Sequence, residues 1–277
     1  MTSASTNVPA VALKGVSVAY GFAGGGRYEA VQPVDVSVED GEFVAILGPT
    51  GCGKSTLLNI AAGLMPPSSG TSLIFGERLS GLNTVAGYLF QQDALMPWKT
   101  SRDNVAIGLE VRGMARAEAL KQADAFLKKV GLASFGDRYP HQLSGGQKKR
   151  VALAQVLVRE PKILLMDEPF GPLDAQTRLI MSELLLDLWQ ADRKAVMFVT
   201  HDLDEAIALS DRVLVMSAGP SSKIIGDFTI GLARPRDIAE VRSLPEFHIL
   251  HNKIWNCLRD EVRKTYGLSD SKAGAAS

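Results

Sequence analysis

The 277-residue sequence has few of the features that mark secreted, membrane-spanning or nucleic-acid-binding proteins. Its two cysteines, Cys52 and Cys257, do not suggest a disulfide framework and fit a reducing compartment. No stretch approaches the ~18 consecutive apolar residues that a membrane-spanning helix needs, and the polar residues 1–9 do not resemble a signal peptide. Thirty basic and thirty acidic side chains balance, so no net charge attracts nucleic acid or anionic lipid. We expect a soluble cytoplasmic protein.

What the sequence does contain is one glycine-rich stretch between a predicted strand (42–47) and a predicted helix (57–62). Its residues are Gly48, Pro49, Thr50, Gly51, Cys52, Gly53, Lys54, Ser55 and Thr56. The spacing G-x-x-x-x-G-K-[ST] lets successive N–H groups face one oxyanion at a positive helix N-terminus. Lys54 is then expected to reach the β- and γ-phosphates and Ser55 to bind Mg²⁺. The stretch predicts a nucleoside triphosphate site.

Strands and helices are predicted to alternate after this phosphate loop. Buried strands are expected at 163–166, 195–199 and 212–216, with helices at 174–190 and 203–209 between them. Residues 11–20 and 31–38 predict strands of an antiparallel section. The segment 101–130 has a helical pattern, with Ser101 as N-cap and Gly131 as C′ residue. We therefore predict an α/β fold with a mostly parallel sheet, an N-terminal antiparallel β section and an inserted α-helical subdomain.

Polar residues follow three of the predicted strands: Gln91, the pair Asp167 and Glu168, and His201. The carboxyl ends of parallel strands meet at one edge of a sheet, so these side chains are expected to lie together. Asp167 would hold a metal ion and Glu168 would take a proton from an attacking water. Taken singly, each has an ordinary explanation: a strand-to-turn transition, a structural histidine or a loop residue.

The order of these motifs resembles the ATP-binding-cassette (ABC) ATPases over roughly residues 10–230. The residues that carry the resemblance, besides the phosphate loop, are Gln91, Leu143, Ser144, Gly145, Gly146, Gln147, Asp167, Glu168, Asp174 and His201. The resemblance implies ATP and Mg²⁺ as ligands, with Ser55, Gln91 and Asp167 at the metal. It implies catalytic roles for Glu168, Gln91 and His201. Pro172 and Gln155 depart from the family pattern at positions that contact no phosphate.

The resemblance also implies a head-to-tail dimer of two copies of this chain. In that dimer the signature residues of one copy close over the γ-phosphate held by Lys54 of the other. The residues expected at the nucleotide from that side are Ser144, Gly145, Gly146, Gln147 and Asp174. An aromatic side chain is expected against adenine; Tyr20 matches best, and Phe22 and Tyr28 remain alternatives.

The text around Gln91, together with Arg234, Pro235 and Arg236, is similar to the nitrate/sulfonate/taurine branch of bacterial importers. This implies a peripheral ATPase subunit at the cytoplasmic face of the inner membrane that powers uptake of a small anionic solute. Its partners would be a separate permease and, indirectly, a periplasmic or lipoprotein solute-binding protein. Two alternatives stay open: a soluble ABC ATPase of translation or repair, and the ATPase of an exporter or lipid-handling system. The balanced charge shows no footprint for nucleic acid.

The resemblance and the composition together divide the chain into three parts. Residues 1–10 are expected to be disordered, and 11–230 to form the ABC ATPase domain with a helical subdomain at about 95–160. Residues 231–277 are expected to form a C-terminal helical tail that packs on the core. That tail is too short for a separate regulatory domain.

Overall fold

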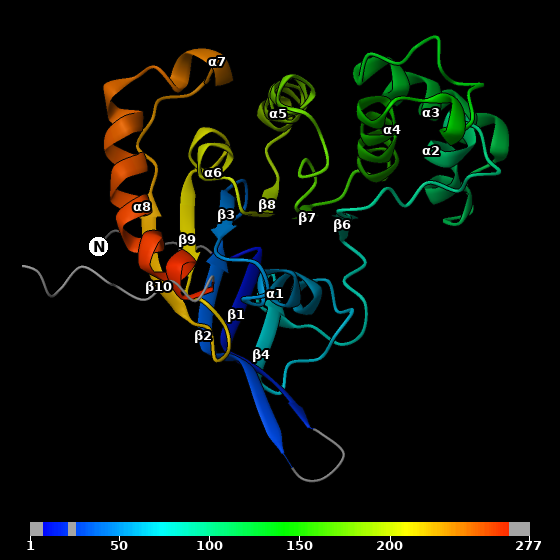
Figure 1. The fold of residues 1–277 in the computed structure, drawn as a ribbon. Helices are drawn as coiled ribbons and strands as arrows, with labels where there is room; N and C mark the ends of the chain where they lie inside the picture. Colours follow the sequence, from blue (N-terminus) through cyan, green and yellow to red (C-terminus); the bar gives the residue numbers. More distant parts are fainter. Residues whose placement is uncertain (1–7, 22–25, 266–277) are drawn as a thin grey trace, which may run out of the picture.

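The computed structural model describes residues 8–21 and 26–265 and is built around a six-stranded sheet (Figure 1). The order across the sheet is β10-β9-β3-β8-β7-β6. These strands are β3 (Phe43–Leu47), β6 (Ala86–Leu89), β7 (Ile163–Asp167), β8 (Ala195–Thr200), β9 (Arg212–Met216) and β10 (Ile224–Thr229). All neighbours are parallel except β10, which is antiparallel to β9. The predicted parallel sheet is confirmed; the edge strand β10 was not predicted because polar and glycine residues interrupt its apolar pattern.

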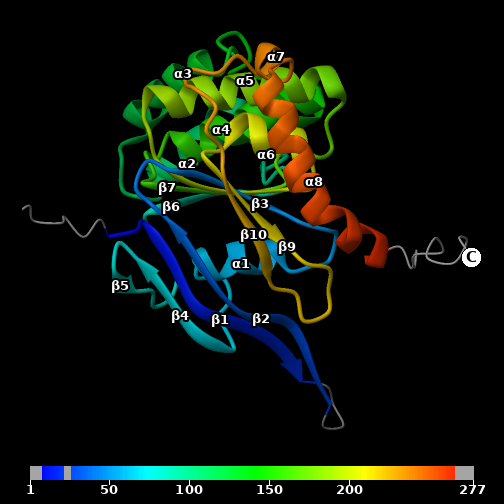
Figure 2. The ribbon, with the colours of Figure 1, turned by 90° about the vertical axis from the view of Figure 1, so that its left-hand side faces the viewer.

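A second, four-stranded antiparallel sheet has the order β2-β1-β4-β5 and confirms the predicted antiparallel section. Its strands are β1 (Val11–Gly21), β2 (Arg27–Val38), β4 (Ser69–Ile74) and the unpredicted β5 (Glu77–Arg78). Helix α1 (Lys54–Ala61) lies between the two sheets (Figure 2). Of the residues expected to be disordered, 1–7 lie outside the described ones. Ala10 is fully buried and its carbonyl accepts a hydrogen bond from Phe75 N, so the ordered chain starts before Val11.

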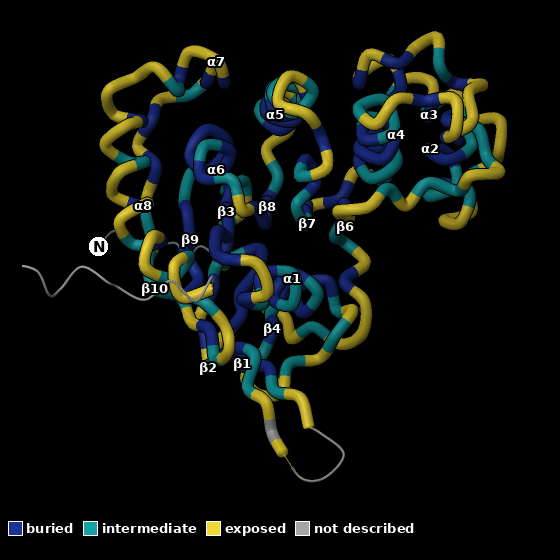
Figure 3. The backbone as a smooth tube through the Cα atoms, in the orientation of Figure 1, coloured by how far each residue is buried: buried dark blue, intermediate teal, exposed yellow. Residues whose placement is uncertain are grey.

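The central strand β3 is buried on both faces, because its alternate side chains enter two different cores. Phe43, Ala45 and Leu47 pack with α5 (Ala175–Ala191), α6 (Leu203–Leu209) and α8 (Pro245–Thr265). Val44 and Ile46 pack with α1 and the antiparallel sheet. Burying such a side chain contributes roughly 1.5–3 kcal/mol. In Figure 3 the middle of the sheet is accordingly dark blue, since every residue of β3 is buried.

The helical subdomain consists of α2 (Ser101–Glu110), α3 (Arg116–Lys129), a short 3₁₀ turn (Pro140–Gln142) and α4 (Gly145–Leu157), set apart from the sheets in Figure 1. It has its own core, which includes Val105, Leu127 and Val151. Gly131 has φ +73° after α3, as predicted for a C′ residue. Ser101 was wrongly predicted as the N-cap. Thr100 caps α2 by accepting from Asp103 N, and Ser101 is buried inside the helix.

The C-terminal segment forms α7 (Ile238–Val241) and α8, which lies along α6, β9 and β10 (Figure 2). Phe247, Ile254 and Leu258 are its buried face. The helix was predicted from the spacing of apolar residues, and its packing follows from burial of that stripe. Among the described residues, no helix is both long and apolar enough to cross a membrane.

Candidate functional site

The phosphate loop leaves the carboxyl end of β3 and turns directly into α1. Gly53 stands at the N-cap position with φ +95°, and Gly51 has φ +79°, a region that favours glycine. A Cβ on Gly53 would lie 2.5 Å from Cγ2 of Val31 on β2. Glycine is therefore required at Gly53, and the N–H groups at the start of α1 are left to face an anion.

The other loop residues divide between the interior and the surface. Cys52 is fully buried, and its carbonyl accepts a 2.5 Å hydrogen bond from Ser222 Oγ. Burial raises the pKa of the Cys52 thiol, so this side chain fills space rather than acting as a nucleophile. Thr50 is exposed at the tip, and Thr56 is half-buried in the first turn of α1.

Lys54 is the buried cation of the loop, with 4% of its surface exposed. Its Nζ donates to the carbonyls of Gly48 at 2.9 Å and Pro49 at 3.0 Å. The same Nζ lies 3.7 Å from Oε1 of Glu168, which follows β7. The ammonium is thus held at the loop beside a carboxylate.

Ser55 and Asp167 form the expected oxygen pair. Ser55 Oγ donates to Asp167 Oδ1 at 2.7 Å, and burial raises the pKa of Asp167. A hydroxyl and a carboxylate are ligands that the hard cation Mg²⁺ prefers. Among the described residues, no group of three His, Cys, Asp or Glu side chains could hold a metal ion alone. The pair therefore fits Mg²⁺ that takes its other ligands from substrate oxygens and water.

Glu168 is held between two basic side chains by a strained backbone. Its φ of +41° is unusual for a residue other than glycine, and its N–H donates to Val199 O at 2.9 Å. Its Oε2 lies 3.1 Å from Nδ1 of His201, which follows β8. Since Oε1 faces Lys54, the carboxylate has one defined orientation at the sheet edge.

Gln91 reaches the same edge from β6. Leu89 of β6 pairs with Met166 of β7, so β6 lies beside the strand that carries Asp167. Gln91 lies two residues beyond the end of β6. Its side chain is exposed and, in the described chain, makes no hydrogen bond to Ser55 or Asp167. Its carbonyl instead accepts from Lys149 Nζ at 2.6 Å. Lys149 was missed from sequence; the available signal was its place on the same face of α4 as the buried Ala152 and Leu153.

The signature residues begin α4 as expected of a capped helix. Gln147 N donates to Ser144 Oγ at 3.3 Å, and Ser144 N donates to Gln147 Oε1 at 2.9 Å, a capping box. A Cβ on Gly146 would lie 2.6 Å from Cγ2 of Thr177 on α5. Asp174 caps α5, accepting from Thr177 N at 3.0 Å and from its Oγ1 at 2.7 Å. The signature helix and Asp174 therefore lie side by side in one chain.

A buried ionic network behind His201 was also missed. Glu205 is 4% exposed, its Oε2 accepts from Thr200 Oγ1 at 2.8 Å, and its Oε1 lies 3.7 Å from Arg178 Nε. Arg178 also donates to Asp202 at 3.0 Å. Burial raises the pKa of Glu205 to about 7. A carboxylate buried four residues after His201 carries no local motif that marks it in a sequence.

Tyr20 and Tyr28 face each other across the β1–β2 hairpin, and both are largely exposed. Tyr20 lies two residues beyond Val18 on β1, across a register shift between Val18 and Ala19, and Val18 pairs with the Val31 that lies against Gly53 of the phosphate loop. The stacking of adenine on Tyr20 stays a prediction. Phe22, the third aromatic candidate, lies outside the described residues.

The model of the ABC transporter family matches residues 31–171 of this chain. The match spans the phosphate loop, the signature residues and the pair Asp167 and Glu168. The chain belongs to the ABC transporter family. This cassette is accordingly an ATP-binding ATPase coupled to transport, which confirms the central expectation from the sequence.

Relatives agree with this assignment. An uncharacterized ABC transporter ATP-binding protein of Methanocaldococcus jannaschii is 47% identical over 87% of the cassette and 88% of its own length. A taurine import ATP-binding protein of Shigella sonnei is 39% identical over 84% and 92%. A nitrate import ATP-binding protein of Synechococcus elongatus is 38% identical over 91% of the cassette and 39% of its own, longer chain.

Solved structures match the fold as well. A dimeric ATP-binding cassette in a post-hydrolysis state with ADP and phosphate is 33% identical, with a TM-score of 0.71 over 80% of this chain and all of that one. A cassette of Clostridium perfringens that is part of an ABC transporter complex is 28% identical, with a TM-score of 0.72 over 89% and 99%. ATP and ADP are thus ligands of this fold family.

Proposed function

We propose that this cassette, bound peripherally at the cytoplasmic face of the inner membrane, hydrolyses ATP to drive uptake of a small anionic solute through a separate permease. The observation that carries the catalytic part is the position of Glu168. Its carboxylate is held between Lys54 and His201, beside the Ser55–Asp167 pair. A base and a phosphate-binding cation at one sheet edge are what hydrolysis of a phosphoanhydride requires.

The phosphates of ATP would lie on the N–H groups of the loop at the start of α1, with Lys54 neutralising the terminal phosphate. Ser55 and Asp167 would hold Mg²⁺, with Gln91 approaching from β6. Bound Mg²⁺ neutralises the negative charge that develops on the phosphate oxygens. Adenine would stack on Tyr20, an arrangement worth roughly 1 kcal/mol.

In the chemical step Glu168 accepts a proton from the water that attacks the terminal phosphorus, and the bond to the leaving ADP oxygen breaks. His201, within 3.1 Å of Oε2, keeps the carboxylate turned toward that water. The strained backbone of Glu168 serves the same orientation, because it aims the side chain back toward the phosphate loop.

Two copies are needed for a complete site. The signature residues start a capped helix, which is a second place for an anion, yet they lie on the helical subdomain and apart from Lys54. A head-to-tail dimer would bring Ser144, Gly146 and Asp174 of one copy to the nucleotide held by the other. The dimeric ATP-binding cassette with the same fold supports this arrangement.

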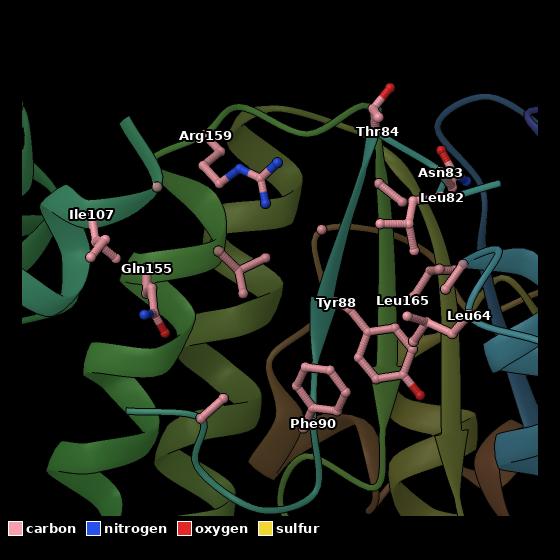
Figure 4. A pocket seen from close by; sticks show the side chains of 16 residues that line it. Leu64, Leu82, Asn83, Thr84, Tyr88, Phe90, Ile107, Gln155, Arg159 and Leu165 are labelled. Atoms are coloured by element: carbon pink, nitrogen blue, oxygen red, sulfur yellow. The ribbon is translucent and has the colours of Figure 1, made fainter. Parts of the chain in front are cut away.

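A groove between the sheet and the helical subdomain is our proposed docking site for a cytoplasmic helix of the permease (Figure 4). It has a volume of about 420 Å³ and is lined by, among others, Leu64, Leu82, Tyr88, Phe90, Ile107, Gln155 and Arg159. Arg159 Nε is buried without a hydrogen-bond partner in the described chain, so the occupant should offer an acceptor as well as apolar side chains. The similar cassette from a multi-subunit transporter supports a permease as that occupant.

The solute class rests on the relatives. Those named for taurine and nitrate import favour an importer of small anions over an exporter or a soluble ATPase of translation or repair. A solute-binding protein would deliver the anion to the permease. Purification of the cassette from native membranes, with mass spectrometry of what accompanies it, tests both partners. Uptake of nitrate or taurine into vesicles that hold the whole transporter tests the solute.

The role of Glu168 is tested by Glu168→Gln, which keeps the shape of the side chain and removes the base. We expect ATP binding to persist, turnover to fall about 10²–10⁴-fold, and an ATP-bound dimer to accumulate. Glu77→Gln on the exposed strand β5 is the matched control. Lys54→Ala, in contrast, should weaken ATP binding itself. Wild-type turnover by Glu168→Gln would exclude Glu168 as the base.

A further inference from the structure

Lys149 is a buried cation on the signature helix whose partners all belong to one loop. Its side chain is 3% exposed. Nζ donates to Phe90 O at 3.2 Å and Gln91 O at 2.6 Å, and it forms an ion pair with Asp93 Oδ1 at 3.0 Å. Both hydrogen bonds of the ammonium and its ion pair are therefore directed at residues 90–93. A buried charge that lost these acceptors would be strongly disfavoured, so the loop and α4 are expected to stay together.

A second buried polar side chain holds the far end of the same segment. Asn104 of α2 is fully buried; its Oδ1 accepts from Met96 N at 2.7 Å. Its Nδ2 donates to the carbonyls of Met96, Lys99 and Thr100 at 3.0–3.1 Å. Residues 90–100 are thus attached to the helical subdomain at both ends, through main-chain groups rather than through variable side-chain packing.

The attachment to the parallel sheet stops at Phe90. Leu89 is still paired with Met166 in the ladder, and the Phe90 ring rests on Tyr88 at 4.3 Å between centroids. The Phe90 carbonyl is already bonded to Lys149. Any rotation of the helical subdomain relative to the sheet must therefore bend the chain at Phe90, and Gln91 must travel with α4.

We propose that Lys149 is a positioning residue that couples the two ATP sites of the dimer by making Gln91 move with Ser144. This rests on the proposed head-to-tail dimer. Ser144 starts the helix that carries Lys149 and contacts the nucleotide held by the other copy, whereas Gln91 serves the nucleotide of its own chain. Closure of α4 on one ATP therefore moves Gln91 into place at the other, and binding at the two sites becomes cooperative.

The test is the ATP dependence of hydrolysis by the full-length chain. With two coupled sites the Hill coefficient can approach 2, and we expect a value above about 1.5 for the wild type. Lys149→Met removes the ammonium from a side chain of similar length and should lower the Hill coefficient to about 1. Lys149→Arg keeps charge and donors and should restore cooperativity. Lys121→Met, on the exposed face of α3, is the matched control.

Three results would overturn the coupling role. These are a folded Lys149→Met chain with wild-type cooperativity, an equal loss in Lys121→Met, and a Lys149→Arg chain as non-cooperative as Lys149→Met. If Lys149→Met does not fold, Asp93→Asn takes its place as the test, because it removes only the ion pair between Lys149 and Asp93. It should lower the Hill coefficient in part, and an unchanged Hill coefficient would contradict the role. A non-cooperative wild type would also overturn it, yet would leave the turnover test of Glu168 unaffected.

Discussion

The first prediction concerns Glu205, whose buried carboxyl group contacts Thr200 and Arg178. Burial raises its pKa to about 7 from an ordinary 4.5. Below about pH 4.5 the folded and unfolded chains both carry the proton. As pH rises from there to about 7, the unfolded chain releases it first, so stability falls, by about 3 kcal/mol in total.

Glu205→Gln mimics the protonated side chain and cannot titrate. Its oxygen can still accept from Thr200, so the fold should be retained. Between pH 5 and pH 8 the free energy of unfolding of the variant should therefore rise relative to wild type by about 2–3 kcal/mol. All other titratable groups are present in both proteins, so their contributions cancel in the difference.

The measurement is guanidinium unfolding followed by circular dichroism at both pH values. Asp187→Asn, at an exposed position of α5, controls for the loss of one charge. A difference between Glu205→Gln and wild type that stays constant from pH 5 to pH 8 would refute the reasoning, because it would mean that Glu205 is already ionised in the folded protein at pH 5.

Two further predictions concern the signature helix and the docking surface. Gly146→Ala should lower turnover about a hundredfold, because the added Cβ would meet Thr177 Cγ2 and displace the start of α4. Adding Thr177→Ser removes that methyl group and keeps the hydroxyl bonded to Asp174, so the double variant should regain activity. Failure of this rescue would place the defect elsewhere. Trp98→Ala removes a side chain that is 73% exposed on the segment that follows Gln91, and it should abolish permease-stimulated hydrolysis, whereas Ile249→Ala on α8 should not. Unchanged stimulation would move the docking surface away from Trp98.

Much of this molecule was predictable from local patterns. The phosphate loop is contiguous, and two of its glycines, Gly51 and Gly53, have backbone angles that favour glycine within the loop itself. The continuous apolar runs that became β7 and β8 predict strands buried on both faces. Polar residues at their ends mark the sheet edge where Glu168 and His201 meet. In each case the determinant lies within a few residues of its effect.

What only the tertiary structure decided depends on partners far away in the chain. Ser101 is a good N-cap by type, yet its hydroxyl donates to Arg138 O, 37 residues away, and Thr100 takes the cap. Lys149 meets Gln91 O at a separation of 58 residues, and Glu168 meets His201 at 33. A sequence determines which side chains can donate, accept or carry charge. Which of them meet is decided by the packing of sheet against helix, because only burial removes the competition of water for the same groups.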